Sequence, residues 1–227
     1  MAVMRRLEVL EIMRAHGLVP TVNAGSVSDY LRVGEALLEG GIPFMEILLR
    51  PYKNTPPRVN TDAIYEARRH FGDALIVGAG TVQTSERAQG AIDAGAEFLV
   101  SNLTDEGVIK IANLCGVLVV PGARDDSQVR IAMSLGVMVV KLFMPMPSLG
   151  IKANLKFLSE FRGIFPRMEF IVTGGVDIDV IGAFLRAGYL FVVPSLGISD
   201  AVKSSDWASV TQNAKLAVCE VVEARTQ

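Results

Sequence analysis

The chain has 227 residues, of which 50% are hydrophobic, and its 22 basic and 24 acidic residues leave a formal net charge of −2. No apolar run approaches the roughly 18 residues that a membrane-spanning helix needs, so the hydrophobic residues belong to a buried core. Because the charge is balanced, nothing in the composition indicates a basic surface for binding nucleic acid or a membrane. The expected partner is therefore a small molecule.

Residues 1–16 mix basic and acidic side chains at helical spacing, which predicts a helix at the start of the chain. Short apolar segments then alternate with helical patterns as far as the C-terminus. Their near-continuous apolarity is typical of parallel strands that are covered on both faces. The expected strands, in chain order, are Leu18–Val22, Phe44–Leu49, Leu75–Gly78, Phe98–Val100, Val117–Val120, Val137–Leu142, Glu169–Val172 and Phe191–Val193.

Several of these strands follow a glycine of the kind that closes a helix. Those glycines are Gly41, Gly95, Gly116, Gly136 and Gly188. Eight strands, each followed by a helical pattern, predict an α/β protein with one domain over residues 1–227, built as a (β/α)8 TIM barrel with an N-terminal helix. The competing architecture is an open doubly wound sheet, which is usually marked by a G-x-G-x-x-G motif after its first strand. The segment after Leu18–Val22 has no such motif.

The chain contains two cysteines and two histidines. Cys115 and Cys219 are too few for a disulfide framework and lack metal-ligand spacing, so we expect reduced side chains. Residues 1–16 resemble neither the apolar region of a signal peptide nor an acid-poor transit peptide, so we expect a cytoplasmic protein. His16 and His70, each in a helical pattern, argue against a histidine-bound metal centre. A carboxylate-held magnesium stays open on these grounds.

Barrel enzymes place their chemistry at the C-terminal ends of the strands, so the residues at these ends form a list of candidate site residues. On this chain they are Glu46 and Arg50 on strand two, Gly78 to Thr81 on strand three, Lys141 on strand six, Thr173 to Gly175 on strand seven, and Pro194 and Ser195 on strand eight. All five strand ends are expected to converge on one mouth of the barrel.

Lys141 ends the apolar run 137–140 and is followed by Leu142 and Phe143. Burial disfavours the charged ammonium form of a lysine and so favours a neutral, nucleophilic amine near pH 7. Such lysines form Schiff bases with ketones. The alternative is a lysine at the rim of a strand that points into solvent, which is the commoner case for a lysine taken at random.

Glu46 lies between Met45 and Ile47. An acid inside an apolar strand is costly unless it is paired or functional. A carboxyl group desolvated there would have a raised pKa, which suits proton transfer near neutrality, and with Lys141 it would form a pair that activates a ketone. A structural ion pair is the alternative.

Thr173, Gly174 and Gly175 precede a helix expected to open at Asp177. Small residues there expose backbone N–H groups beside a helix N-terminus, as in the phosphate site after strand seven of many barrels. An ordinary strand-to-helix turn is the alternative. Ser195 on the next strand, where such sites draw their remaining donors, favours a phosphate or a similar anion.

Taken together, these residues resemble the family of 2-keto-3-deoxy-6-phosphogluconate (KDPG) and 4-hydroxy-2-oxoglutarate (KHG) aldolases, and the resemblance covers nearly the whole chain. It rests on Met45–Ile47 with Arg50, Val77–Val82, Pro121–Gly122, Lys141–Phe143 and Thr173–Val176. The stretch Gly78–Val82 and the lysine motif together are highly specific.

The resemblance implies a role for each site residue. Lys141 would be the Schiff-base lysine and Glu46 the general acid and base, while Arg50 and Thr81 would bind the substrate carboxylate. The phosphate site would comprise Thr173, Gly174, Gly175 and Ser195. The family is typically homotrimeric, and we expect neither a cofactor nor a metal.

The expected reaction is cleavage of a 2-keto-4-hydroxy acid, KDPG or a close relative, to pyruvate and an aldehyde. One alternative is an aldolase for an unphosphorylated substrate such as 4-hydroxy-2-oxoglutarate. Others are a barrel isomerase or synthase that acts on a phosphorylated metabolite without an iminium, and a catalytically silent trimeric binding protein. The joint presence of the lysine, the glutamate and the arginine argues against a catalytically silent protein.

The chain departs from the family pattern at both ends of the mouth. Pro194 stands where a glycine usually precedes the strand-eight serine. Because a proline has no N–H to donate, the binding of phosphate is expected to be weakened or altered. After the lysine motif, Met144 intervenes before Pro145 and Pro147, which reshapes the mouth.

The loop Pro51–Asn60 also looks longer than in the family and carries Lys53 and Arg58. These two cations are either solvated surface charges, which is the commoner case, or replacements for lost anion contacts. On balance the sequence favours the phosphorylated substrate over a smaller unphosphorylated one.

Overall fold

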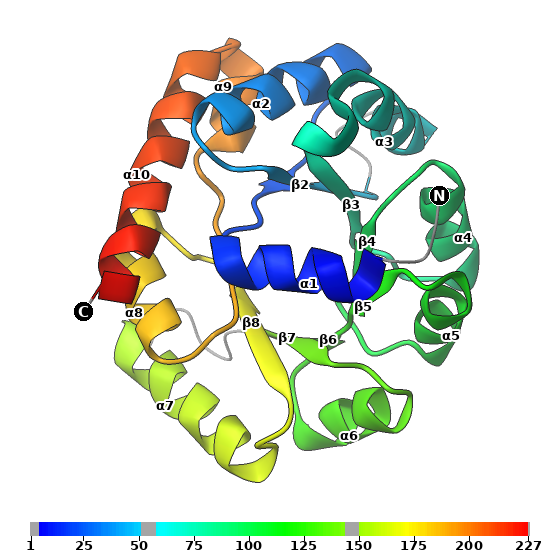
Figure 1. Cartoon of the computed structure of the whole chain (residues 1–227), viewed down its shortest axis with the longest axis vertical. Helices are drawn as coiled ribbons and strands as arrows, with labels where there is room; N and C mark the ends of the chain where they lie inside the picture. Colours follow the sequence, from blue (N-terminus) through cyan, green and yellow to red (C-terminus); the bar gives the residue numbers. More distant parts are fainter. Residues whose placement is uncertain (1–4, 51–57, 144–149, 227) are drawn as a thin grey trace.

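The computed structural model describes residues 5–50, 58–143 and 150–226 (Figure 1). Its helices are α1 (Arg5–His16), α2 (Val27–Glu39), α3 (Arg58–Phe71), α4 (Ser85–Asp93), α5 (Glu106–Cys115), α6 (Asp126–Ser134), α7 (Gly150–Ile164), α8 (Ile181–Arg186), α9 (Ile198–Ser204) and α10 (Trp207–Thr226). Its strands are β1 (Thr21–Val22), β2 (Phe44–Leu48), β3 (Ile76–Gly80), β4 (Phe98–Val100), β5 (Leu118–Val120), β6 (Gly122–Ala123), β7 (Val139–Phe143), β8 (Glu169–Thr173) and β9 (Val192–Val193).

The strands form two parallel sheets, β1 to β5 and β6 to β9, in sequence order. Pro121 separates β5 from β6, and its carbonyl accepts a hydrogen bond from Lys141 N at 2.8 Å, so both segments belong to one barrel strand. The barrel closes where Val19 N donates to Val192 O and Val192 N donates to Gly17 O, each at 3.0 Å. The predicted (β/α)8 barrel is confirmed.

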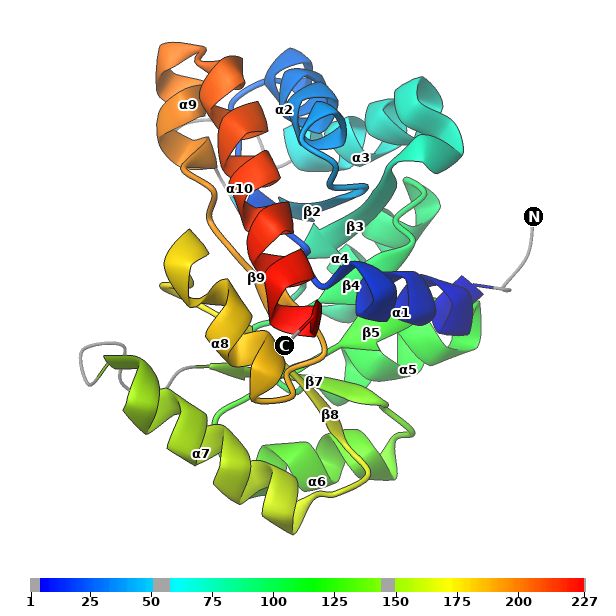
Figure 2. The same cartoon turned by 60° about the vertical axis from the view of Figure 1, so that its left-hand side comes forward.

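Helices surround the barrel, and α1 lies across one end of it (Figure 1). This is the end where the strands begin, because α1 leads directly into β1. Helix α10 packs against both α2 and α8, which links the last part of the chain to the first (Figure 2). The glycines expected to close helices at positions 41, 95, 116, 136 and 188 all have positive φ angles.

Three strands extend beyond their predicted ends. We expected strand three to stop at Gly78, but β3 continues to Gly80, because these glycines make room inside the barrel for neighbouring side chains rather than for a turn. A Cβ atom at Gly78 would lie 2.3 Å from the Phe98 ring. Strand six was expected to end at Leu142, but β7 continues to Phe143, and strand seven was expected to end at Val172, but β8 continues to Thr173.

The interior of the barrel and the spaces under its helices form one hydrophobic core. Its largest fully buried side chains include Tyr30, Phe44, Phe98 and Phe170. A core that is continuous from α1 to α10 supports the single-domain assignment for residues 1–227, which stays a prediction.

Candidate active site

Glu46 stands in the middle of β2, and its side chain is fully buried. Gly80 on the neighbouring strand makes room for it, because a Cβ atom at Gly80 would lie 2.0 Å from Glu46 Oε1. Within the described part of the chain, neither carboxylate oxygen has a hydrogen-bond partner. Burial raises the pKa of Glu46, and the positive charges of Lys141 and Arg50 oppose that rise. A carboxyl group in this setting is suited to accept and release a proton near neutral pH.

Lys141 lies on β7, and only 7% of its surface is exposed. The alternative of a lysine that points into solvent is therefore wrong. Nζ lies 5.3 Å from the ring centroid of Phe143. Because the charge of Lys141 lowers the pKa of Glu46, the amine and the carboxyl group share the same end of the barrel interior.

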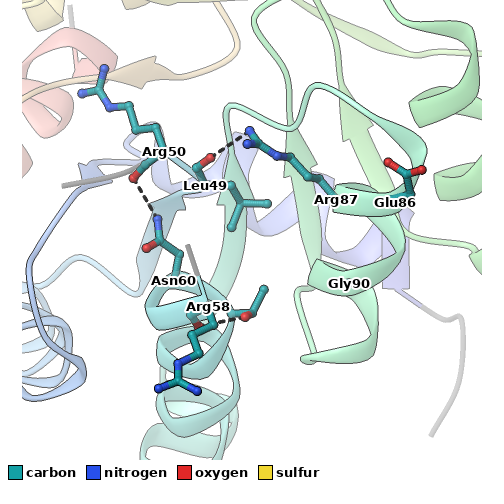
Figure 3. Close-up of a pocket in the computed structure, with 8 residues that line it drawn as sticks. Leu49, Arg50, Arg58, Asn60, Glu86, Arg87 and Gly90 are labelled. Atoms are coloured by element: carbon teal, nitrogen blue, oxygen red, sulfur yellow. Dashed lines mark hydrogen bonds between the residues drawn. The ribbon is translucent and has the colours of Figure 1, made fainter. Parts of the chain in front are cut away.

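Arg50 follows β2 and has an exposed side chain. Figure 3 shows this side chain extending away from Asn60 and Arg87. Its charge also lowers the pKa of Glu46, so the guanidinium belongs to the same mouth as the carboxyl group. This position fits the predicted contact with a substrate carboxylate.

Two residues absent from the sequence-based list hold the end of β2 in place. Asn60 is buried, and its Nδ2 donates to Leu48 O and, at 3.1 Å, to Arg50 O. Arg87 Nη1 donates to Leu49 O at 3.2 Å. They line a cavity of about 280 Å³ between α3 and α4 (Figure 3). The sequence placed Asn60 at the end of the loop Pro51–Asn60, whereas α3 already begins at Arg58, so no local signal marked Asn60 as a brace for a strand.

Thr81 directly follows β3 and has a φ angle of 57°, in the left-handed region that residues other than glycine rarely adopt. The strand ends beneath it are tied together, because Leu49 N donates to Gly80 O at 2.7 Å. Thr81 and Arg50 therefore emerge from adjacent, hydrogen-bonded strands. A strained backbone of this kind is frequent at functional positions.

The far end of the mouth is more open. Thr173 ends β8 and is half-buried, whereas Gly174 and Gly175 are exposed and have φ angles of 86° and 67°. Ser195 is exposed and lines a separate hollow with Asp177. The structure brings these residues to neighbouring strand ends, as the sequence predicted.

A helical segment does open at Asp177, but its first turn is not α-helical. A 3₁₀ turn, Ile178–Val180, comes first, and α8 begins only at Ile181 and has six residues. The side chain of Asp177 makes no capping hydrogen bond. The dipole at this end is therefore weaker than a long helix would supply, since it builds up from aligned peptide units.

Part of the predicted departures from the family falls outside the described residues, namely Lys53, Met144, Pro145 and Pro147. Arg58 is described: it begins α3, is exposed, and lines the cavity between α3 and α4, which Arg50 also lines. Among the described residues, no group of three His, Cys, Asp or Glu side chains could hold a metal ion. No helix in the described ranges is long and apolar enough to cross a membrane.

A buried lysine that shares a barrel mouth with a carboxyl group of raised pKa is the chemistry of a Schiff-base aldolase, in which the amine attacks a ketone and the acid moves protons. Comparison with known proteins agrees. The model of the aldolase family "KDPG and KHG aldolase" matches residues 9–213, and the chain belongs to this family.

Two named relatives show how close the similarity is. The 2-dehydro-3-deoxy-phosphogluconate aldolase of Treponema pallidum (strain Nichols) is 30% identical, over 90% of this chain and 93% of the relative. The KHG/KDPG aldolase of Escherichia coli (strain K12) is 27% identical, over 91% of this chain and 93% of the relative. Both span almost the whole chain, so the protein is an aldolase, and therefore a carbon–carbon lyase.

Solved structures agree with the fold and with the chemistry. The KDPG aldolase of Legionella pneumophila, with pyruvate captured at low pH as a covalent carbinolamine intermediate, superposes with a TM-score of 0.80 at 25% identity, covering 91% of this chain and 96% of that one. The KDPG aldolase of Zymomonas mobilis ATCC 29191 gives a TM-score of 0.78 at 27% identity, covering 94% and 96%.

Proposed function

We propose that the protein cleaves KDPG or a close relative to pyruvate and an aldehyde, through an iminium on Lys141. The observation that carries the proposal is the burial of both Lys141 and Glu46 in one barrel, where the charge of Lys141 lowers the pKa of Glu46. Support also comes from the names of the relatives, which refer to KDPG and KHG.

The first steps belong to Lys141. Its neutral Nζ adds to the C2 ketone of the substrate to form a carbinolamine, which loses water to give the iminium. The iminium then accepts the electron pair of the C3–C4 bond as that bond breaks. This leaves an enamine of pyruvate on Lys141 and releases the aldehyde that was C4.

Glu46 moves the protons. During cleavage its carboxylate takes the proton of the C4 hydroxyl, directly or through a water, and it then returns a proton to C3 of the enamine. Hydrolysis of the resulting pyruvate iminium frees Lys141. Burial raises the pKa of Glu46, whereas Lys141 and Arg50 oppose the rise.

Arg50 and Thr81 are proposed to hold the carboxylate of the keto acid. They stand at adjacent strand ends, and a guanidinium can bind a carboxylate through two parallel hydrogen bonds. This arrangement would place C2 toward Lys141 and direct the rest of the substrate toward β8 and β9.

The far end of the substrate is proposed to bind near Thr173, Gly174, Gly175 and Ser195. The alternative, an unphosphorylated substrate such as 4-hydroxy-2-oxoglutarate, is favoured by specific features of this end. Pro194 offers no N–H, and the hollow lined by Ser195 also contains the carboxylates of Asp177 and Asp179. A phosphate dianion gains less here than at a site of backbone donors alone.

The assembly and location of the protein complete the proposal. We propose a homotrimer, on the grounds of family membership, to be checked by light scattering on the purified protein. A cytoplasmic location is supported by Cys115 and Cys219, which are both free. Cell fractionation tests it.

The deciding experiment is treatment with pyruvate and borohydride, followed by peptide mass mapping. Reduction traps the iminium as a stable secondary amine, and we expect it at Lys141 alone. Labelling at another lysine would contradict the assignment of the Schiff base to Lys141. No labelling at all would contradict it too, and would favour a barrel isomerase or synthase, or a silent binding protein. A panel of phosphorylated and unphosphorylated 2-keto-4-hydroxy acids then identifies the substrate.

A further inference from the structure

The ring of Phe143 at the end of β7 has two cations near it. Lys141 Nζ lies 5.3 Å from the ring centroid, and the guanidinium carbon of Arg124 lies 4.4 Å from it. An arginine at this distance from a ring face is held by cation–π attraction. Arg124 therefore has a preferred position close to the reacting lysine.

The sheet register shows where Arg124 stands. Residues 122 and 123 of β6 pair with Lys141 and Leu142 of β7, so Arg124, the next residue, comes beside Phe143. Phe143 in turn pairs with Thr173 on β8. Neighbouring strands lie about 4.8 Å apart, so Arg124 and Thr173 are separated by roughly 10 Å across the mouth. An arginine side chain can cover most of that span.

The guanidinium of Arg124 is available for a ligand. The residue is exposed, and among the described residues its guanidinium has no ion pair and no hydrogen bond. The adjacent acid, Asp125, is engaged elsewhere, because its carboxylate accepts from Gln128 N at 3.0 Å and also from the Ser127 hydroxyl. The sequence offered no sign of this site, because Arg124 lies in an ordinary strand-to-helix turn.

We propose that Arg124 binds the anionic group at the far end of the substrate, whether phosphate or carboxylate. This inference rests on the proposed function of the same site. It explains how an anion can be held where Pro194 has removed a backbone donor and where Asp177 and Asp179 line the hollow beside Ser195. Arg124 directly follows β6, so it lies on the opposite side of Lys141 from the glycine turn after β8.

The test compares three substrates in Arg124→Gln: KDPG, 4-hydroxy-2-oxoglutarate and unphosphorylated 2-keto-3-deoxygluconate. Loss of a hydrogen bond to a charged group should raise KM for the two substrates with an anionic far end, KDPG and 4-hydroxy-2-oxoglutarate, by about tenfold to a hundredfold. The values for 2-keto-3-deoxygluconate, whose far end is uncharged, and the rate of pyruvate trapping should not change. Whichever of the first two substrates loses more identifies the group that Arg124 binds, and Arg124→Lys should recover part of the loss.

Arg130→Gln is the matched control. Arg130 lies on α6, away from the mouth, and its guanidinium carbon lies 5.3 Å from the ring centroid of Phe165. It should leave all three substrates unaffected. An equal loss on all three substrates in Arg124→Gln, a slower trapping of pyruvate, or no change at all would each overturn the inference. Failure of wild-type protein to trap pyruvate would instead overturn the proposed function, so the two outcomes are distinguishable.

Discussion

The two sides of the barrel mouth differ in how firmly they are built. On the side of β2 and β3, Glu46 is fully buried, and the carbonyls of Leu48, Leu49 and Arg50 are all hydrogen-bonded to side chains of α3 or α4. On the side of β8 and β9, the turn consists of exposed glycines, followed by a 3₁₀ turn and a short helix.

This difference matches the demands of the two halves of a substrate. Proton transfer and iminium formation need reacting groups held within fractions of an ångström, which only a packed setting provides. Recognition of the far end tolerates a looser frame, because an anion can be bound by several interchangeable donors. In the proposed function, the firm side would position Glu46 and Arg50, and the open side would set the range of substrates.

The largest effect is expected from Lys141. Lys141→Ala should abolish turnover and pyruvate trapping, because no amine remains to form the iminium. Lys141→Arg should do the same, since a guanidinium stays charged and is a poor nucleophile. Pyruvate release is the measurement, and substantial activity in either variant would place the reacting centre elsewhere.

Glu46→Gln should lower turnover by about 10² to 10⁴-fold, the usual contribution of a general acid or base, while trapping of pyruvate persists. The amide keeps the shape of the side chain but cannot accept the C4 proton. Single-turnover cleavage rates test this. A loss smaller than about tenfold would mean that another group moves the protons.

Gly80→Ala should destabilise the protein by about 1–3 kcal/mol, because overpacking forces neighbouring groups to shift. The new Cβ atom would lie 2.0 Å from Glu46 Oε1 and 2.6 Å from Leu48 Cδ2. Gly90→Ala is the matched control: its Cβ would meet nothing within 4 Å on α4, and it should stabilise the helix by up to about 1 kcal/mol. Equal responses in denaturant unfolding would show that the fit around Glu46 is loose.

Pro194→Gly restores a backbone N–H on the open side of the mouth. We expect kcat/KM for the phosphorylated substrate to rise by roughly tenfold, equivalent to about 1.4 kcal/mol, with little change for 4-hydroxy-2-oxoglutarate. An equal change for both substrates, or a decrease for both, would show that the proline shapes the barrel mouth instead of limiting anion binding.

The smallest effect concerns the pH dependence of stability. Burial raises the pKa of Glu46 above its ordinary value of 4.5, so the folded state holds a proton that the unfolded state has released. This contribution to stability is fully present below pH 4.5 and is lost as pH rises through the folded pKa. Glu46→Gln should therefore flatten the decline in unfolding free energy above pH 4.5. A parallel pH profile in the variant would contradict the burial argument.

The sequence predicted the barrel well, because buried parallel strands are apolar throughout and helix-closing glycines mark their starts. It also placed Glu46 and Lys141 at the mouth. It ended β3 too early, since Gly78 and Gly80 resemble turn residues until the Phe98 ring and the Glu46 carboxylate are seen to occupy the space.

The bracing of the mouth could not be predicted in the same way. Asn60 reaches a carbonyl 12 residues away, and Arg87 reaches one 38 residues away. Contacts over such separations follow from the packing of helices on strands, which has no local pattern. The stacking of Arg124 on Phe143 is of the same kind, because it depends on the pairing of β6 with β7.

The division of the barrel at Pro121 separates the reacting groups. Glu46 and Arg50 belong to the sheet β1 to β5, whereas Lys141 belongs to the sheet β6 to β9. The proposed nucleophile and proton acceptor thus lie on two sheets that meet at Pro121 and at the Val19–Val192 closure. In the proposed reaction, a keto acid joined covalently to Lys141, with its carboxylate on Arg50, would connect the two sheets across the mouth of the barrel.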